Sequence, residues 1–378
     1  MENRFFDEIH GNFGFGCMRL PMKDSAVDLE QMTEMVDTFL NQGFNYFDTA
    51  HGYLGGASET ALRETLVRRY PRNRYILTNK LTTFYFQRES DIRPLFQSQL
   101  EACGVEYFDF YLMHAQDGAI FEKFKRCHAY ETALELKAEG KIRHFGISFH
   151  DKAPVLERIL TEYPQVEAVQ IQLNYLDYED ATVESRKVYE VCEKHHKPVI
   201  VMEPVKGGSL VRLPEEAQSV LDTLQEDAAA KKSNASYALR FAASLPNVCV
   251  VLSGMSDMAQ MRDNTGTMKA FTPLSETERS AVEQVRDVFR GMHMIPCTTC
   301  HYCTKGCPKQ IPIPEIFTAM NQRLGSGQLA ESVESYRAAT AAGGKASDCV
   351  ACRQCEKACP QHIPIVARLK ECAVALEG

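Results

Sequence analysis

The stretch FNYFDTA (residues 44–50) is apolar along most of its length and ends in an aspartate, a threonine and an alanine. A run of this kind, without strict alternation of apolar and polar residues, is typical of a strand in a parallel sheet that is covered on both faces. Similar runs recur along the chain. Together they predict eight strands, over residues 13–20, 44–50, 75–81, 108–114, 142–148, 168–174, 198–203 and 248–254.

Amphipathic stretches lie between these runs, for example DLEQMTEMVDTFLNQG (28–43), SETALRETLVRRY (58–70) and YETALELKAEGK (130–141). Their apolar residues recur at three and four positions, which predicts helices. Eight strand–helix pairs over about 270 residues predict an α/β fold, a (β/α)8 TIM barrel. An open doubly wound sheet is the alternative, but its Gly-x-Gly-x-x-Gly turn is missing from GNFGFGCMRL (11–20).

The composition is that of an ordinary globular protein, with 44% hydrophobic and 24% charged residues among 378. A net charge of -8 argues against nucleic acid and anionic membranes as partners, because both attract clustered positive charge. The first residues, MENRFFDEIHGNFGFG, are acidic where a signal peptide has a basic start. We therefore expect a cytoplasmic protein without membrane contact, whose 14 cysteines are thiols or metal ligands rather than disulfides.

Two cysteine-rich runs lie 52 residues apart, CTTCHYCTKGCPKQIPI (297–313) and CVACRQCEKACPQHIPI (349–365). The spacing Cys-x2-Cys-x2-Cys-x3-Cys-Pro is typical of proteins with two [4Fe-4S] clusters, in which the fourth cysteine of each run ligates the other cluster. Structural zinc sites are the alternative, since zinc also binds Cys-x2-Cys pairs. The iron–sulfur interpretation predicts one cluster on Cys297, Cys300, Cys303 and Cys359, and a second on Cys349, Cys352, Cys355 and Cys307.

The segments around these runs predict helices. SETERSAVEQVRDVFRGM (275–292) opens with Ser-x-x-Glu and ends near Gly291, and PEIFTAMNQRLGSG (314–327) and LAESVESYRAATAAGG (329–344) predict a helix, a turn and a helix. We expect a barrel domain over residues 1–291 and a mostly α-helical, ferredoxin-like domain over residues 292–378. The six cysteines outside the runs are expected to be buried apolar residues: Cys17, Cys103, Cys127, Cys192, Cys249 and Cys372.

A family resemblance appears at three of the predicted strands. FNYFDTAHGYLGGASE (44–59), the lysine that ends YILTNK (75–80) and the histidine that ends FDFYLMH (108–114) resemble the aldo-keto reductases, over roughly residues 13–290. The resemblance implies a catalytic tetrad of Asp48, Tyr53, Lys80 and His114. All four lie at or just after the carboxyl ends of predicted strands, where barrel active sites lie.

The same four residue types suit the reduction of a carbonyl group. Hydride addition builds negative charge on the carbonyl oxygen, and a proton must reach that oxygen. Tyr53 is expected to give the proton, with its pKa lowered by the Lys80 ammonium. Asp48 balances the charge of Lys80, and His114 orients the substrate oxygen.

The resemblance also implies a nicotinamide nucleotide, NAD(H) or NADP(H). Ser148 and Gln170 match positions that hold the nicotinamide carboxamide, the loop PVKGGSL (204–210) matches the one under the pyrophosphate, and Asn264 matches an adenine contact. The implied nucleotide-binding residues are Ser148, Gln170, Gly207, Gly208, Ser209, Leu210, Ser253, Gly254, Gln260 and Asn264.

The sequence departs from the family pattern around this site. Phe149 replaces an asparagine, and Met202 replaces the aromatic residue that stacks on the nicotinamide. The cationic positions that clamp the 2'-phosphate of NADPH align with Gly254, Met255 and Gln260, none of which is cationic. A phosphate without an ammonium or guanidinium loses its strongest contact, so the resemblance does not imply a preference for NADPH over NADH.

Hydride transfer moves two electrons and an iron–sulfur cluster moves one, so a flavin normally stands between the two. We favour an oxidoreductase whose clusters exchange electrons with an electron-transfer protein partner and serve a small-molecule substrate at the barrel, with one cluster on the order of 15 Å from Tyr53. A plain NAD(P)H-dependent carbonyl reductase with structural or oxygen-sensing clusters is the second interpretation. A redox-sensing, nucleotide-binding subunit without catalysis is the third.

Overall fold

The computed structural model describes residues 3–224 and 232–378, and the chain packs into two compact units. The first unit runs to Pro204 and also contains Ala235–Leu274, while the second contains Val205–Asn234 and Ser275–Gly378. The segments 205–234 and 275–291 therefore pack with the cysteine-rich part of the chain. A division of the sequence at a single position does not describe this packing.

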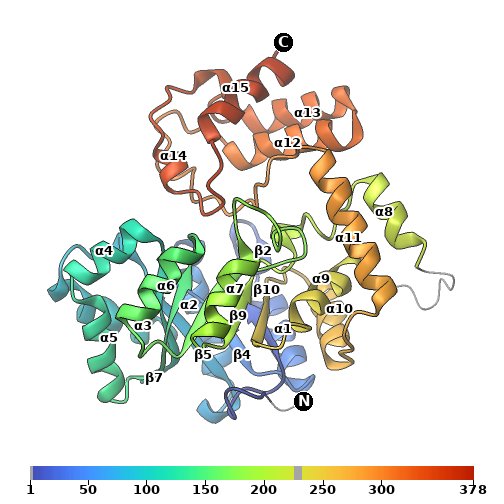
Figure 1. The fold of residues 1–378 in the computed structure, drawn as a ribbon. Helices are drawn as coiled ribbons and strands as arrows, with labels where there is room; N and C mark the ends of the chain where they lie inside the picture. The colour runs from blue at the N-terminus through green and yellow to red at the C-terminus, as the bar shows by residue number, and fades with distance from the viewer. Residues whose placement is uncertain (1–2, 225–231) are drawn as a thin grey trace. The chain divides into compact units, whose positions relative to one another are not determined.

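Eight parallel strands of the first unit form a closed barrel (Figure 1). Closure depends on β1, in which Phe15 pairs with Ser253 on one side and with Phe47 on the other. The predicted (β/α)8 barrel is confirmed, and the open doubly wound sheet is excluded. In chain order the barrel strands are β1 (Phe13–Gly16), β4 (Tyr46–Asp48), β5 (Ile76–Leu81), β6 (Phe108–Gln116), β7 (Ile142–Phe149), β8 (Ala168–Gln172), β9 (Val199–Met202) and β10 (Val248–Ser253).

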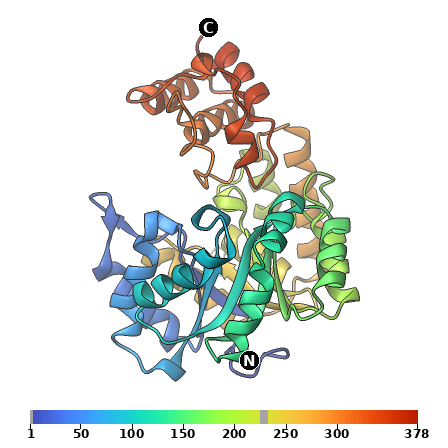
Figure 2. The same ribbon diagram turned by 90° about the vertical axis from the view of Figure 1, so that its left-hand side faces the viewer.

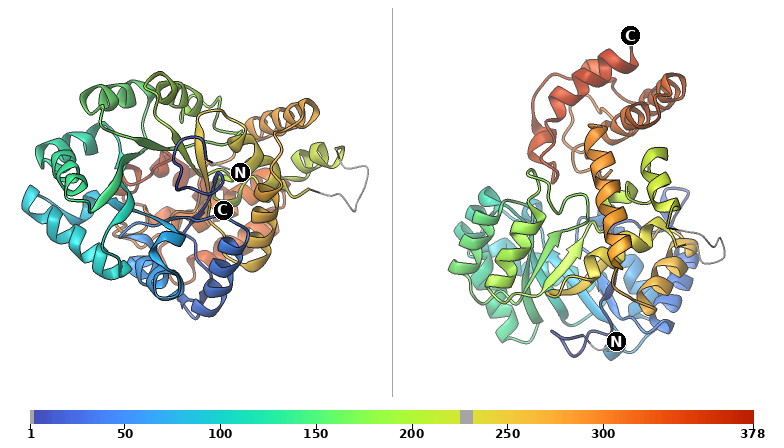
Figure 3. Two further views of the ribbon diagram at one scale, coloured as in Figure 1. Left: turned by 90° about the horizontal axis from the view of Figure 1, so that it is seen from below. Right: turned by 45° about the vertical axis from the view of Figure 1, so that its right-hand side comes forward.

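Helices surround the ring of strands, as the view from below in Figure 3 shows. The first is typical: Asp28 caps it by accepting a hydrogen bond from the Gln31 amide, and it buries Met35 and Phe39 against the barrel. The helices of this unit are α1 (Leu29–Asn41), α2 (Ala57–Leu62), α3 (Ile92–Cys103), α4 (Gly118–Arg126), α5 (Ala129–Ala138), α6 (Ala153–Glu162), α7 (Ser185–Lys194), α9 (Asn234–Ala243) and α10 (Met258–Lys269).

A small hairpin of β2 (Met22–Lys23) and β3 (Ala26–Val27) follows β1. The sequence did not predict it, because two-residue strands with largely exposed side chains show no apolar pattern. The hairpin stands outside the barrel sheet.

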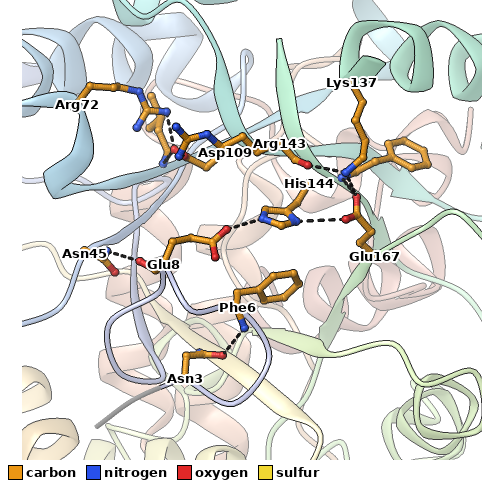
Figure 4. A network of polar contacts seen from close by, with 12 residues as sticks. Asn3, Phe6, Glu8, Asn45, Arg72, Asp109, Lys137, Arg143, His144 and Glu167 are labelled. Carbon is orange, nitrogen blue, oxygen red and sulfur yellow. Dashed lines mark hydrogen bonds and ion pairs between the residues drawn. The ribbon is translucent and has the colours of Figure 1, made fainter. Parts of the chain in front are cut away.

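The segment before β1 packs at the amino ends of the barrel strands (Figure 4). Phe6 is buried and its ring meets Phe110 edge to face, with centroids 5.0 Å apart. The Asn3 side-chain amide donates to the Cys249 carbonyl at 2.7 Å. His144 on β7 hydrogen-bonds Glu8 through one ring nitrogen and Glu167 through the other.

Regular structure in the described residues of the second unit is helical: α8 (Glu215–Asp222), α11 (Glu276–Gly291), α12 (Ile313–Ser326), α13 (Leu329–Thr340), α14 (Gln354–Lys357) and α15 (Ile365–Leu376). Figure 2 shows α12, α13 and α15 gathered into one bundle. Helix α11 begins with the predicted capping box, in which Ser275 and Glu278 each accept a backbone hydrogen bond from the other. The expected helix, turn and helix between the cysteine runs is present as α12 and α13.

Within residues 3–224 and 232–378, helices of sufficient length and apolarity to span a bilayer are absent.

Candidate functional site

The four tetrad residues come together at the carboxyl ends of three neighbouring strands. Asp48 is the last residue of β4, Lys80 lies near the end of β5, and His114 lies near the end of β6. Tyr53 begins the short 3-10 turn Tyr53–Gly56 that follows β4. Carboxyl-terminal strand ends are where barrel enzymes carry their reactive groups.

Asp48 and Lys80 form a buried ion pair, with 2.5 Å between the Lys80 Nζ and the Asp48 Oδ1. Lys80 also donates to the Thr49 carbonyl at 2.8 Å, and the Gln170 side-chain amide donates to the Asp48 Oδ2 at 3.0 Å. Burial raises the pKa of Asp48 and lowers that of Lys80, and each charge opposes the shift of the other. The additional hydrogen bonds satisfy groups that a buried pair would otherwise leave without partners.

Tyr53 lies against this pair. The Lys80 Nζ is 5.0 Å from the centre of the Tyr53 ring, and the His114 ring is 6.1 Å away at 76°. Burial raises the pKa of Tyr53 well above its ordinary value, the Asp48 carboxylate raises it further, and Arg19 opposes the shift. The direction of this shift is opposite to the predicted lowering, because burial is its largest cause and the Asp48 charge adds to it.

A raised pKa keeps the Tyr53 phenol protonated at neutral pH. A protonated phenol can give its proton to a carbonyl oxygen as that oxygen gains negative charge. The ammonium of Lys80 lies close enough to stabilise the phenolate that the transfer leaves. Tyr53 thus has the arrangement of a proton donor in a reduction.

His114 is oriented by Thr82, whose hydroxyl lies 2.7 Å from the His114 Nδ1. Burial, together with Lys80 and His150, lowers the pKa of His114 well below its ordinary value, so the ring is neutral at neutral pH. The contact with Thr82 leaves the Nε2 for a substrate oxygen. Thr82 was not predicted as a site residue, although it directly follows the predicted strand 75–81 and lies two residues after Lys80.

Two of the predicted nicotinamide contacts lie side by side on the barrel, because Ser148 on β7 pairs with Gln170 on β8. The Ser148 hydroxyl is buried and has no hydrogen-bond partner among the described residues. A buried hydroxyl without a partner is costly, and a bound carboxamide would satisfy it. Gln170 already donates to Asp48 and retains its side-chain carbonyl as an acceptor.

The residues predicted to contact the adenosine part of the nucleotide differ in the contacts that they make. Asn264 on α10 donates to the Ser253 hydroxyl at 3.0 Å. Gln260 donates through its backbone and side-chain nitrogens to Asp257, the residue that caps α10. Gly254 adjoins the side chain of Arg19, whose guanidinium pairs with Glu203 at 3.6 Å. The side chain that adjoins Gly254 is thus an arginine whose charge is paired with a carboxylate.

The remaining nucleotide-loop positions, Gly207, Gly208, Ser209 and Leu210, belong to the second unit. Gly207 has a φ of +62°, and a Cβ there would lie 2.5 Å from the Thr298 carbonyl oxygen. Leu210 is fully buried. This loop therefore packs directly against the residue that follows Cys297.

The cysteine runs fold alike. At the offset of 52 residues, the same positions of each run have a positive φ: Thr299 and Ala351, His301 and Arg353, Gln310 and His362. Equal spacing in the sequence has produced equal loops. The internal repeat is therefore structural as well as sequential.

Each loop surrounds a cavity with cysteines from both runs. Cys297, Cys300, Cys303 and Cys359 line one, and the other lining residues are mainly apolar, among them Ile313, Phe317, Ile363 and Ile365. Cys307, Cys349, Cys352 and Cys355 line the other, together with Ile311, Ile313, Val366 and Leu369. Four thiols around an apolar cavity are the donor set of an iron–sulfur cluster, and the grouping is the crossed one that the spacing predicts. The six remaining cysteines are buried, as expected.

Comparisons with known proteins agree with both halves of this description. The model of the Aldo/keto reductase family matches residues 12–287, and the model of the 4Fe-4S dicluster domain matches residues 296–363.

Relatives and solved structures match the barrel. An uncharacterized oxidoreductase of Bacillus subtilis is 24% identical over 74% of this chain and 94% of its own length. The NADH-specific methylglyoxal reductase of Escherichia coli is 26% identical over 46% of this chain and 57% of its own. The structure of an aldo-keto reductase from Bacillus halodurans in its holo form is 25% identical, has a TM-score of 0.59 and covers 75% of this chain and 95% of that one. An aldo-keto reductase from Klebsiella pneumoniae in complex with NADPH is 18% identical, with a TM-score of 0.60 over 73% and 90%.

Proposed function

The chain belongs to the aldo/keto reductase family and carries a 4Fe-4S dicluster domain, and from this we propose an oxidoreductase that reduces a carbonyl group with electrons delivered through its clusters. From the sequence we propose residues 1–291 as the catalytic barrel domain and residues 292–378 as the cluster domain, although segments 205–234 and 275–291 pack with the second unit. The substrate is a small molecule with a carbonyl or a similarly polarised bond.

The arrangement of Tyr53 against the Asp48–Lys80 pair is the observation that carries the proposal. The His114 Nε2 and the Tyr53 hydroxyl donate hydrogen bonds to the substrate oxygen and orient it. As negative charge develops on that oxygen, Tyr53 gives up its proton, and Lys80 stabilises the phenolate. Asp48, held by Gln170, keeps Lys80 in place through the change of charge.

We assign the two four-cysteine cavities as the ligand sets of two [4Fe-4S] clusters. When bound, the clusters would supply electrons one at a time; reduction of a carbonyl to an alcohol takes two electrons and two protons, of which Tyr53 gives the proton that reaches the oxygen and solvent supplies the other. The proposal places one cluster on the order of 15 Å from the Tyr53 hydroxyl or the bound cofactor during turnover. A crystal structure of the cluster-loaded protein with the cysteine-rich unit on the amino-terminal face of the barrel would contradict it.

We propose a nicotinamide nucleotide at Ser148 and Gln170, with a preference for NADH over NADPH. The unsatisfied Ser148 hydroxyl supports the carboxamide contact. Gly254, Met255 and Gln260 align with the cationic positions of the family and none is cationic, and the Gln260 side chain donates to Asp257, so a 2'-phosphate would lack its strongest contact there. Dissociation constants of both nucleotides for the protein test this preference, and equal values would contradict it. We propose a flavin as the bridging cofactor, because nicotinamide transfers two electrons together and each cluster transfers one.

The Ser148 hydroxyl also favours a second function, an ordinary nicotinamide-dependent carbonyl reductase whose clusters are structural. The two functions differ in a cluster-free variant, Cys297→Ala with Cys349→Ala. Steady NADH-dependent turnover by this variant would support the second function. Loss of turnover with the barrel still folded supports the first.

Anaerobic purification, identification of the released organic cofactor and a Tyr53→Phe variant test the proposed function. With methylglyoxal as the first trial substrate, Tyr53→Phe is expected to lower kcat/KM by about a hundredfold or more, since it removes the proton donor. Tyr85→Phe is the matched control, because Tyr85 lies in a neighbouring loop, in edge contact with His51. Equal activity in all three proteins across a panel of aldehydes and ketones would overturn the proposal.

A further inference from the structure

The geometry points to the loop around Cys352 as the docking face for a small acidic one-electron carrier protein. We define the Cys352 face as Lys309, Val350, Cys352 and Arg353, which line the second cysteine cavity together. The inference rests on the proposed function in one respect, namely that the clusters exchange electrons with a partner.

Exposure distinguishes the two cavities. All fourteen cysteines lie in the described parts of the chain, and among them Cys352 alone is exposed. Its counterpart in the first run, Cys300, is only partly exposed. Since the two loops have the same backbone conformation, the difference arises from what covers them.

The two cysteine loops differ in how far one pair of equivalent residues is covered by the rest of the second unit. Thr298 in the first run is 2% exposed and lies against Gly207, whereas Val350 in the second run is 57% exposed. The nucleotide loop therefore covers the first cysteine loop within the second unit. The second cysteine loop presents an apolar side chain and a ligand sulfur at the surface.

The two cysteine cavities also differ in the charge of the residues that line them. The charged residues that line the second cavity are Lys309 and Arg353, both cationic and exposed. The Arg353 side chain is 74% exposed although its Nε lies 3.9 Å from the Glu356 carboxylate, and Glu356 itself does not line the cavity. The first cavity is lined instead by His301, which lies 3.6 Å from the Glu315 carboxylate. Two cations around an exposed apolar residue complement an acidic surface, and such complementarity speeds association and sets orientation.

The electron step at this face is simple. The reduced carrier loses one electron and the cluster held by Cys307, Cys349, Cys352 and Cys355 gains it, with no bond made or broken. An exposed ligand sulfur shortens the path between the two redox centres. We therefore assign the second cluster as the entry point and the covered first cluster as the next site.

The test uses the cluster-loaded protein, without carbonyl substrate, and a chemically reduced bacterial ferredoxin of strongly negative net charge as the probe. Stopped-flow absorbance gives the second-order rate constant of cluster reduction. Lys309→Glu with Arg353→Glu is expected to lower this constant by about tenfold at low ionic strength, and added salt is expected to remove the difference. Arg337→Glu with Lys370→Glu is the control, because it makes the same change in net charge at exposed positions outside the cavity lining.

An equal loss in both double variants would overturn the inference, as would a wild-type rate that does not fall with rising salt. If the glutamate variants lose iron, Lys309→Gln with Arg353→Gln takes their place, with an expected loss of about threefold. Cytochrome c, a basic acceptor, should show the opposite salt dependence when it oxidises protein whose clusters have been reduced beforehand. Because carbonyl substrate is absent, failure of the proposed reductase activity leaves these outcomes unchanged.

Discussion

In the barrel unit the larger of two apolar clusters among the described residues extends from Phe13 on β1 to Met268 on α10, whereas the core of the second unit is small and gathers around cysteines. Cys303 and Cys355 are buried members of that second core, and Cys297, Cys307, Cys349 and Cys359 pack against it. The barrel thus has its own apolar residues to hold it together. In the cysteine-rich unit, cysteines that we assign as cluster ligands occupy core positions at which a larger domain has leucine or valine.

Removal of iron should produce the largest difference in stability between the two units. Chelation is expected to abolish hydrogen-exchange protection in α12, α13 and α15, because a small metal-centred core folds only with its metal. The barrel strands should keep their protection. Hydrogen exchange followed by mass spectrometry measures both units in one sample. Full protection of α12 in iron-free protein would show that the apolar residues alone suffice there, and the contrast between the units would fail.

The contact between Gly207 and Thr298 offers a sharper test, since it joins the nucleotide loop to the first cysteine loop within the second unit. Gly207→Ala places a Cβ 2.5 Å from the Thr298 carbonyl oxygen and should destabilise this unit by about 2 kcal/mol. The expected result is a faster loss of one cluster when a chelator is added, with the stability of the barrel unchanged.

Gly208→Ala is the matched control for that variant. Gly208 has a φ of +99°, so alanine there is also strained, but a Cβ would meet only the end of the Arg212 side chain at 3.8 Å. Its cost should be limited to about 1 kcal/mol of backbone strain. Equal rates of cluster loss in the two variants would show that backbone strain, rather than contact with Thr298, explains the effect.

The barrel and the cysteine cavities could be predicted from sequence for a shared reason, which is that both are repeats. Eight recurring apolar runs predict eight strands, and the family resemblance then identifies residues such as Asp48 and Lys80 at the ends of those strands. Two runs with one spacing predict crossed ligation. Periodicity of this kind is local information, available without knowledge of tertiary packing.

The features that sequence did not predict depend on tertiary contacts. Gly207 was interpreted as a nucleotide-loop glycine, but its small size is required by Thr298, 91 residues later. The pKa of Tyr53 depends on the sum of burial and several charges, so the residue types alone gave the wrong direction. The packing of α8 with α11 likewise joins segments whose proximity no local pattern indicates.

The smallest expected effect is a pH dependence of the stability of the barrel unit. Burial alone would lower the pKa of His144, but hydrogen bonds to Glu167 and Glu8 raise it above the ordinary value of 6.5. A group whose pKa is raised on folding stabilises the protein fully below its unfolded pKa and loses that contribution as pH rises through the folded pKa. Protonated His144, bonded to Glu167 and Glu8, should therefore stabilise the barrel at pH 6. This contribution should be lost as the pH rises above 6.5 and through the raised pKa of His144. Glu167, whose pKa is lowered to about 2, stays ionised throughout this window.

His144→Gln is expected to destabilise the barrel by about 1 kcal/mol more at pH 6 than at pH 9, since lost packing contributes equally at both. Urea unfolding of the barrel at the two pH values measures the difference. His128→Gln is the control, because His128 also pairs with a glutamate, Glu89, but its side chain is 63% exposed and solvent screens the pair. The apolar contacts of Phe6 and Ile9 do not titrate, so a pH-independent cost at His144 would mean that they alone hold the amino-terminal segment against the barrel.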